Sequence, residues 1–166
     1  AGLGATQVAL AIMDNGLKNR TRHNMHSHWK TLPSHDYSTA IWGMLNPEKP
    51  KVFKEALYAA PRGEKLQKIL RDSLNKTKNK ELINEIHTYL WHFMNDPISK
   101  NFYIKTLKED NYENFSNAVY LLTDSKHSKK GADIIPALEH ALKNDDKKKR
   151  ILILKRLSRY LGKKSV

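Results

Sequence analysis

The hydrophobic positions of this chain repeat with the period of an α-helix over most of its length. The clearest case lies in residues 79–94, where seven apolar side chains follow the spacing i, i+1, i+4, i+7, i+8, i+11 and i+12. Positions with this spacing form one continuous stripe, so the segment is predicted to be a helix with one buried side. The stripe consists of Leu82, Ile83, Ile86, Tyr89, Leu90, Phe93 and Met94.

Shorter stretches with similar spacing predict further helices, separated by Pro, Asn and Gly. We expect Asp96 to be the N-cap of the next helix, with Pro97 in its first turn, where a proline loses no hydrogen bond by lacking an amide donor. We expect Asp133 and either Asp145 or Asp146 to cap the last two helices, and Gly162 to end the last one. The predicted helices lie near residues 6–13, 34–45, 50–60, 66–74, 98–109, 111–123, 133–142 and 146–162.

No segment has the pattern of a β-strand, because the chain has no alternating Val/Ile/Thr-rich run and no Asn-Gly hairpin. Helices joined by short turns favour antiparallel neighbours, so we predict an all-α fold. We expect a compact multi-helix bundle or an irregular stack of about seven to nine antiparallel helices. Residues 1–166 suit a single α-helical domain, and the start at Ala1 without Met indicates one excised from a larger protein.

The charge of the chain indicates what such a domain would bind. Lys and Arg number 30 against 17 for Asp and Glu, which gives a formal net charge of +13 at pH 7. A surface of this charge attracts polyanions and accelerates encounters with them. Ten of the cations fall in the last 24 positions, so the final helix is the first candidate for a binding surface.

A helical projection of the final segment separates a basic arc from an apolar one. Leu152 lies within the basic arc, where it either covers a neighbouring helix or makes an apolar contact with a partner. The apolar arc, predicted to be buried, holds Ile153, Leu154, Leu157, Tyr160 and Leu161, and Ile151 at the margin is expected to be easily buried. The basic arc holds Lys148, Lys149, Lys155, Arg156 and Arg159. Its charges are either simply solvated or form an anion-binding surface.

Two further segments carry cations that could join this surface. The loop 124–131 contributes Lys126, Lys129 and Lys130, and the irregular stretch 15–35 contributes Arg20, Arg22 and Lys30. Whether the fold brings them together is left open at this point.

Two tryptophans are candidate contacts. Trp91 projects from the side of its helix opposite the apolar stripe, so either its helix is covered on two faces or the ring is exposed. An exposed ring could stack on a base or lie at the level of lipid head groups. Trp29 is interleaved with the cations and histidines of residues 15–35.

The sequence contains few residues that would indicate a catalytic or metal-binding site. His23, His26, His28 and His35 could supply a general base and acid for phosphodiester cleavage, but the sequence gives them no geometry. Zinc sites need about four ligands of fixed geometry, and the chain has no cysteine. Phosphate-loop, dinucleotide, nucleophile-elbow and zinc-protease motifs are absent from the sequence. We therefore assign no catalytic residue, metal or cofactor, and expect no enzyme.

The expected function is a non-catalytic basic helical module that docks on a polyanion. Nucleic acid is the first choice, because a long phosphate track requires charge spread over several segments. Anionic lipid, including a phosphoinositide bound in a pocket between helices, is the alternative from another class. A protein-protein adaptor with an acidic partner comes third, and a histidine-dependent ribonuclease fourth. No apolar run approaches the roughly 18 residues of a membrane span, so we expect an intracellular protein, soluble or peripheral at a membrane surface.

Overall fold

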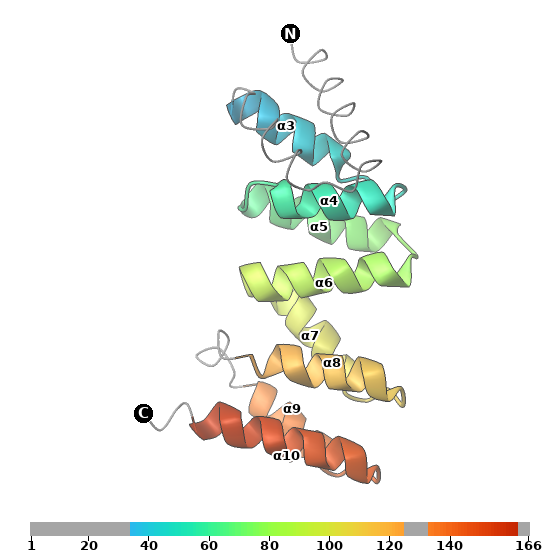
Figure 1. The fold of residues 1–166 in the computed structure, drawn as a ribbon, viewed down its shortest axis with the longest axis vertical. Helices are drawn as coiled ribbons and strands as arrows, with labels where there is room; N and C mark the ends of the chain where they lie inside the picture. The colour runs from blue at the N-terminus through green and yellow to red at the C-terminus, as the bar shows by residue number, and fades with distance from the viewer. Residues whose placement is uncertain (1–33, 125–132, 163–166) are drawn as a thin grey trace. The chain divides into compact units, whose positions relative to one another are not determined.

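The computed structural model describes residues 34–124 and 133–162, and the side chains of residues 38–124 and 133–160 (Figure 1). All regular secondary structure in these ranges is helical, without a strand, which confirms the predicted all-α class. The predicted segment 6–13 lies outside the described residues. The helices are α3 (Ser34–Met44), α4 (Pro50–Ala59), α5 (Glu64–Lys76), α6 (Lys80–Met94), α7 (Pro97–Thr106), α8 (Tyr112–Leu122), α9 (Ile134–Ala141) and α10 (Lys147–Gly162).

Two helix starts follow the predicted N-cap chemistry. The Asp96 carboxylate accepts a hydrogen bond of 2.8 Å from the backbone N–H of Ile98 at the start of α7. At the start of α10, Asp146 Oδ1 accepts one of 2.8 Å from the backbone N–H of Lys148. Each bond satisfies an amide that has no partner within its own helix. The sequence predicted both caps because the acceptor precedes the first helical turn.

Asp133 occupies the N-cap position of α9 as predicted, but its carboxylate does not cap the helix. Its side chain makes no cap hydrogen bond, and its backbone is in the αR region rather than the extended conformation usual at an N-cap. The Asp133 carboxylate instead accepts a hydrogen bond of 2.7 Å from Lys100 Nζ of α7. The Asp133 carboxylate therefore contacts a lysine of α7 instead of an amide at the start of α9.

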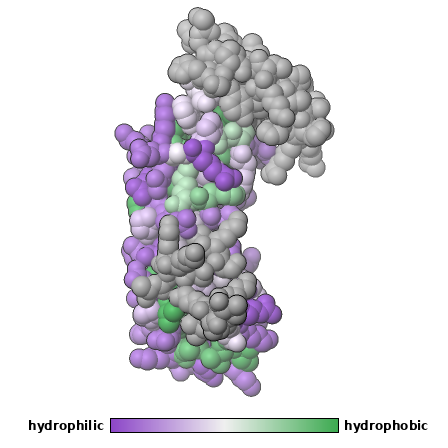
Figure 2. All heavy atoms as spheres, turned by 90° about the vertical axis from the view of Figure 1, so that its left-hand side faces the viewer, coloured by the Kyte–Doolittle hydropathy of each residue, from purple (hydrophilic) through white to green (hydrophobic). Residues whose placement is uncertain are grey.

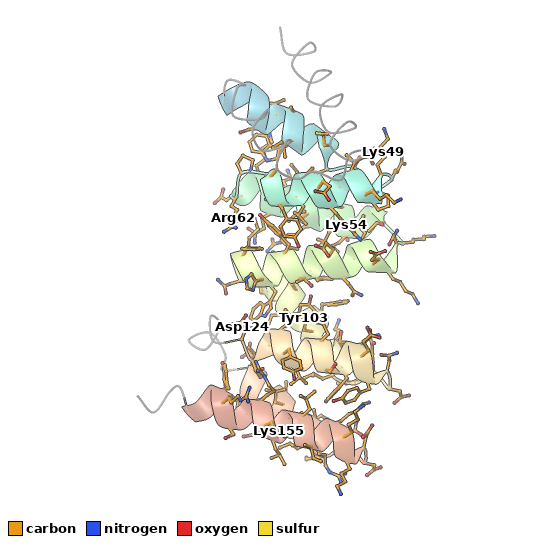
Figure 3. The ribbon with its side chains drawn as sticks, viewed as in Figure 1. Lys49, Lys54, Arg62, Tyr103, Asp124 and Lys155 are labelled. Carbon is orange, nitrogen blue, oxygen red and sulfur yellow. The ribbon has the colours of Figure 1, made fainter. Side chains whose placement is uncertain are left out.

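The chain divides into two compact units, residues 1–86 and 87–166, and the boundary falls within α6. This division does not test the expectation of a single domain, which stays a prediction. In the first unit α3 packs against α4. Lys54 (labelled in Figure 3) forms an ion pair with Glu81, and the Tyr58 hydroxyl contacts the Glu85 carboxylate, so polar contacts join α4 to the first part of α6. Fully buried side chains of this unit include Ile41, Phe53, Leu57, Leu66, Leu70, Leu82 and Ile86.

The second unit contains the helix predicted to be most basic. Here α8 packs against both α7 and α10, and α10 also packs against α9. The apolar side of α8 faces the core, since its four members are all fully buried: Phe115, Ala118, Val119 and Leu122. The core around them also includes Trp91, Tyr103, Leu107, Ile134, Leu138, Leu152, Ile153 and Leu157.

Trp91 belongs to this core, with 1 % of its surface exposed. Its indole Nε1 donates a hydrogen bond of 2.7 Å to the backbone carbonyl oxygen of Leu121. The helix α6 is thus covered at Trp91, on the side opposite its apolar stripe. This agrees with the interpretation that the helix is covered on two faces. The alternative of an exposed contact is wrong for Trp91, because a buried indole with a satisfied N–H offers no surface to a base or a lipid.

Candidate functional site

The α10 helix turns one side toward α8 and α9 and the other side outward. Buried residues recur along the inner side, whereas the residues between them are exposed to solvent. The inner side includes Lys149, Leu152, Ile153, Leu157 and Tyr160. We call the exposed side the outward face of α10; it consists of Lys147, Lys148, Ile151, Leu154, Lys155, Ser158 and Arg159.

The inner side is rotated around the helix relative to the predicted apolar arc. Leu152, the leucine within the predicted basic arc, is only 8 % exposed and packs in the core. Leu154, predicted to be buried, is 56 % exposed, and Ile151 is 42 % exposed. Four consecutive large apolar side chains, residues 151–154, point in directions that cover most of a turn. One packing partner cannot bury all of them, so some must face outward.

Lys149 was predicted to be a surface cation, and the structure corrects this. It is 3 % exposed, and its Nζ donates a hydrogen bond of 2.9 Å to the backbone carbonyl oxygen of Glu109. The same Nζ lies 5.1 Å from the centroid of the Phe115 ring. The aliphatic stem of a lysine can cover apolar surface while its ammonium reaches a polar partner. Lys149 is therefore part of the packing around α8.

Arg156 is also engaged within the protein. Its Nε donates a hydrogen bond of 2.9 Å to Thr123 Oγ1, and its guanidinium carbon lies 4.7 Å from the centroid of the Tyr120 ring. Arg156 is half-buried, whereas Tyr120 is 51 % exposed. This cation thus joins the end of α8 to α10 and lies at the edge of the surface.

The other three cations of the predicted arc do lie on the outward face. Lys155 (Figure 3) and Arg159 are exposed, and so is Lys148, whose Nζ lies 3.9 Å from the centroid of the Tyr112 ring. Lys147 joins them and was missed by the sequence reasoning. The sequence could have indicated its place, because Lys147 lies four residues before Ile151 and therefore on the same side of the helix.

The outward face combines charge with exposed apolar surface. Lys147 and Lys148 precede Ile151 and Leu154 along the helix, and Lys155 and Arg159 follow them. Figure 2 shows hydrophobic spheres among hydrophilic ones at the lower end of the view, where α10 lies. An exposed apolar pair flanked by cations is a surface suited to a partner that is both anionic and able to remove apolar groups from water.

Several predicted site residues lie outside the described residues. These are Arg20, Arg22, Trp29, Lys30, Lys126, Lys129 and Lys130, together with His23, His26 and His28. The side chain of His35 is likewise not described, although its backbone belongs to α3. Convergence of these cations with α10 therefore stays a prediction.

The second unit contains one strongly perturbed histidine, His87 of α6. Its ring stacks on Phe102 with the centroids 3.9 Å apart, and its Nδ1 lies 2.9 Å from Ser99 Oγ. Burial lowers the pKa of His87 to about 4, against an opposing influence of the Asp96 charge. His87 is 6 % exposed. A neutral imidazole packed in this way between α6 and α7 has a structural role.

Among the described side chains, those of residues 38–124 and 133–160, no three His, Asp or Glu side chains come together as a metal site would require. The helices described there include none with the length and apolar character needed to cross a bilayer. Comparison of the chain with protein-family models, curated proteins and solved structures finds no match. The function must therefore be argued from the outward face of α10 itself.

Proposed function

We propose that this chain is a non-catalytic binding module that docks on anionic membrane surfaces through the outward face of α10. The observation that carries the proposal is the exposure of Ile151 and Leu154, at 42 % and 56 %, on the same face as four cations. An interfacial helix gains affinity from the apolar area it buries and from attraction to anionic lipids. Near a membrane surface each Lys or Arg contributes about 1 kcal/mol.

The apolar pair is what favours lipid over the nucleic acid expected from sequence alone. A protein that binds the phosphate backbone of nucleic acid gains its affinity from cations that release condensed counterions. An exposed leucine such as Leu154 adds nothing to this electrostatic contribution. In contrast, transfer of an exposed leucine or isoleucine to an acyl-chain region removes apolar surface from water. Of the five α10 cations in the predicted track, Lys149 and Arg156 are not exposed and donate hydrogen bonds within the protein, which shortens the track.

A specific observation supports single-stranded nucleic acid as the second candidate. Tyr120 is 51 % exposed, and the Arg156 guanidinium lies over its ring. Exposed aromatic rings next to cations form stacking platforms for unpaired bases, and such stacking contributes about 1–3 kcal/mol per base. This candidate uses the edge of α8, whereas the membrane proposal uses Ile151 and Leu154.

The test measures co-sedimentation with vesicles of phosphatidylcholine, with and without phosphatidylserine, at low and high salt. We expect binding only to the anionic vesicles, weakened by salt and by the double substitution Ile151→Ser, Leu154→Ser. Ile98→Ser is the matched control, because Ile98 is similarly exposed at 47 % but belongs to α7 and not to the outward face of α10. Vesicle binding that survives the double substitution would refute the proposal.

The same variants separate the two candidates. Tyr120→Ala is expected to weaken binding to single-stranded RNA if nucleic acid is the partner, and to leave vesicle binding nearly unchanged if lipid is. Lys155→Glu with Arg159→Glu should weaken binding to either polyanion. Lys105→Glu and Lys108→Glu, two exposed positions near the end of α7, control for the change in net charge. Binding of RNA but of no vesicle would replace the membrane proposal with the second candidate.

A further inference from the structure

We infer that the outward face of α10 responds to the charge density of a membrane and does not recognise an individual phosphoinositide head group. This inference rests on the proposed membrane docking and specifies its ligand. It replaces the sequence-based expectation of a phosphoinositide pocket between helices.

A pocket between helices would need the α10 cations that face the neighbouring helices. The α10 cations that are buried or half-buried are Lys149, Arg150 and Arg156, and all three have partners within the protein. Lys149 Nζ donates to the backbone carbonyl oxygen of Glu109, and Arg156 Nε donates to Thr123 Oγ1. The Arg150 guanidinium donates a hydrogen bond of 2.8 Å to the backbone carbonyl oxygen of Asn144. Binding a phosphate with any of them would compete with these hydrogen bonds.

The cations that remain accessible lie along a convex helix surface. Lys148 and Arg159 are eleven positions apart, which corresponds to about 16 Å along the axis. This separation exceeds the size of one inositol ring with its phosphates. The four cations at the two ends of the apolar pair, Lys147, Lys148, Lys155 and Arg159, therefore do not all contact the head group of one lipid.

The position of the apolar pair fixes the orientation of the helix. Ile151 and Leu154 lie between the two pairs of cations, so both cationic ends approach the head groups when the apolar side chains enter the bilayer. The α10 axis then lies parallel to the membrane plane, as in other interfacial helices. In this orientation the attraction depends on the local density of negative charge, because the four cations share no single lipid.

The experiment compares two vesicle series matched for measured zeta potential. One series contains phosphatidylserine and the other phosphatidylinositol 4,5-bisphosphate, each in phosphatidylcholine. We expect the partition coefficients to agree within about twofold at equal potential, since surface potential governs the attraction. A preference of an order of magnitude for the phosphoinositide would overturn the inference while leaving the proposed membrane docking in place. Failure to bind either series would overturn both.

Two substitutions sharpen the result. Lys155→Gln should lower binding to the two series by the same factor, because it removes one charge from the outward face. Arg156→Gln should leave the ratio between the series unchanged, because Arg156 contacts Thr123 and Tyr120. A selective loss of phosphoinositide binding in Arg156→Gln would show that a head-group pocket exists. Thermal unfolding of each variant verifies that it is folded.

Discussion

Lys149 Nζ and the backbone carbonyl oxygen of Glu109 are joined by a hydrogen bond of 2.9 Å between residues forty positions apart in the chain. The bond links the start of α10 to the turn before α8. A lysine that a helical projection places among surface cations thereby helps to hold two helices together. Some of the α10 cations therefore pack within the protein, whereas others are exposed to solvent.

The first prediction concerns this division. Lys149→Ala should destabilise the protein by about 1–3 kcal/mol, because it removes a buried hydrogen bond to a carbonyl oxygen and the packing of the lysine stem. Lys155→Ala, on the outward face, should change stability by no more than about 0.5 kcal/mol. Urea unfolding of both variants checks this. Equal stability of the two variants would contradict the internal role of Lys149.

The second prediction concerns Trp91. Trp91→Phe keeps an aromatic ring in the core but leaves the Leu121 carbonyl oxygen without the indole N–H, which donates at 2.7 Å. We expect a loss of about 1–3 kcal/mol from the unpaired acceptor. The further truncation Trp91→Ala should cost about 3–5 kcal/mol, because it leaves a large cavity. Thermal unfolding measures both, and vesicle binding at a temperature where each variant is folded should be unchanged.

The third prediction is a pH dependence of stability that arises from His87. Its pKa falls from 6.5 to about 4 on folding, so between these pH values the unfolded chain binds more protons than the folded one. Stability is therefore fully present above pH 6.5 and is lost as the pH falls toward 4. One pKa unit corresponds to about 1.4 kcal/mol, and we expect a loss of roughly 2–3 kcal/mol over this window.

His87→Gln should reduce this loss, since glutamine does not titrate and can still bond to Ser99. The control for a His→Gln substitution as such is His140→Gln on α9, where the side chain is exposed. Urea midpoints at the two ends of the window give the comparison, and carboxylate titration is common to all three proteins. An unaltered pH dependence in His87→Gln would refute this assignment.

The fourth prediction compares two aspartates near helix starts. Asp146→Ala removes the acceptor for the Lys148 amide and should cost about 1 kcal/mol. Asp133→Ala removes no cap bond, only an ion pair with Lys100 that involves an exposed carboxylate, so about 0.5 kcal/mol or less is expected. Chemical denaturation measures both. A larger effect at Asp133 than at Asp146 would show that the ion pair matters more than the cap.

Local sequence patterns were enough to predict most of the helices and several of their ends. The apolar stripe predicted for residues 79–94 corresponds to α6, and α4 and α7 begin at Pro50 and Pro97. The described residues stop at Gly162, so the expectation that it ends the last helix stays a prediction. Such features depend on backbone geometry within a few residues, so nothing distant is needed to recognise them. Asp133 shows the limit of this reasoning, because its carboxylate pairs with Lys100, thirty-three positions earlier.

The sequence by itself determined that the chain is helical and that its last helix is rich in cations, because period and composition are local properties. Only the tertiary structure decided which side of α10 is buried. Large apolar residues point around most of this helix, and the stems of Lys149 and Arg156 can pack as well as a leucine. The rings of Tyr112, Phe115 and Tyr120 lie against three of its cations. Ile151 and Leu154, in contrast, are exposed to solvent.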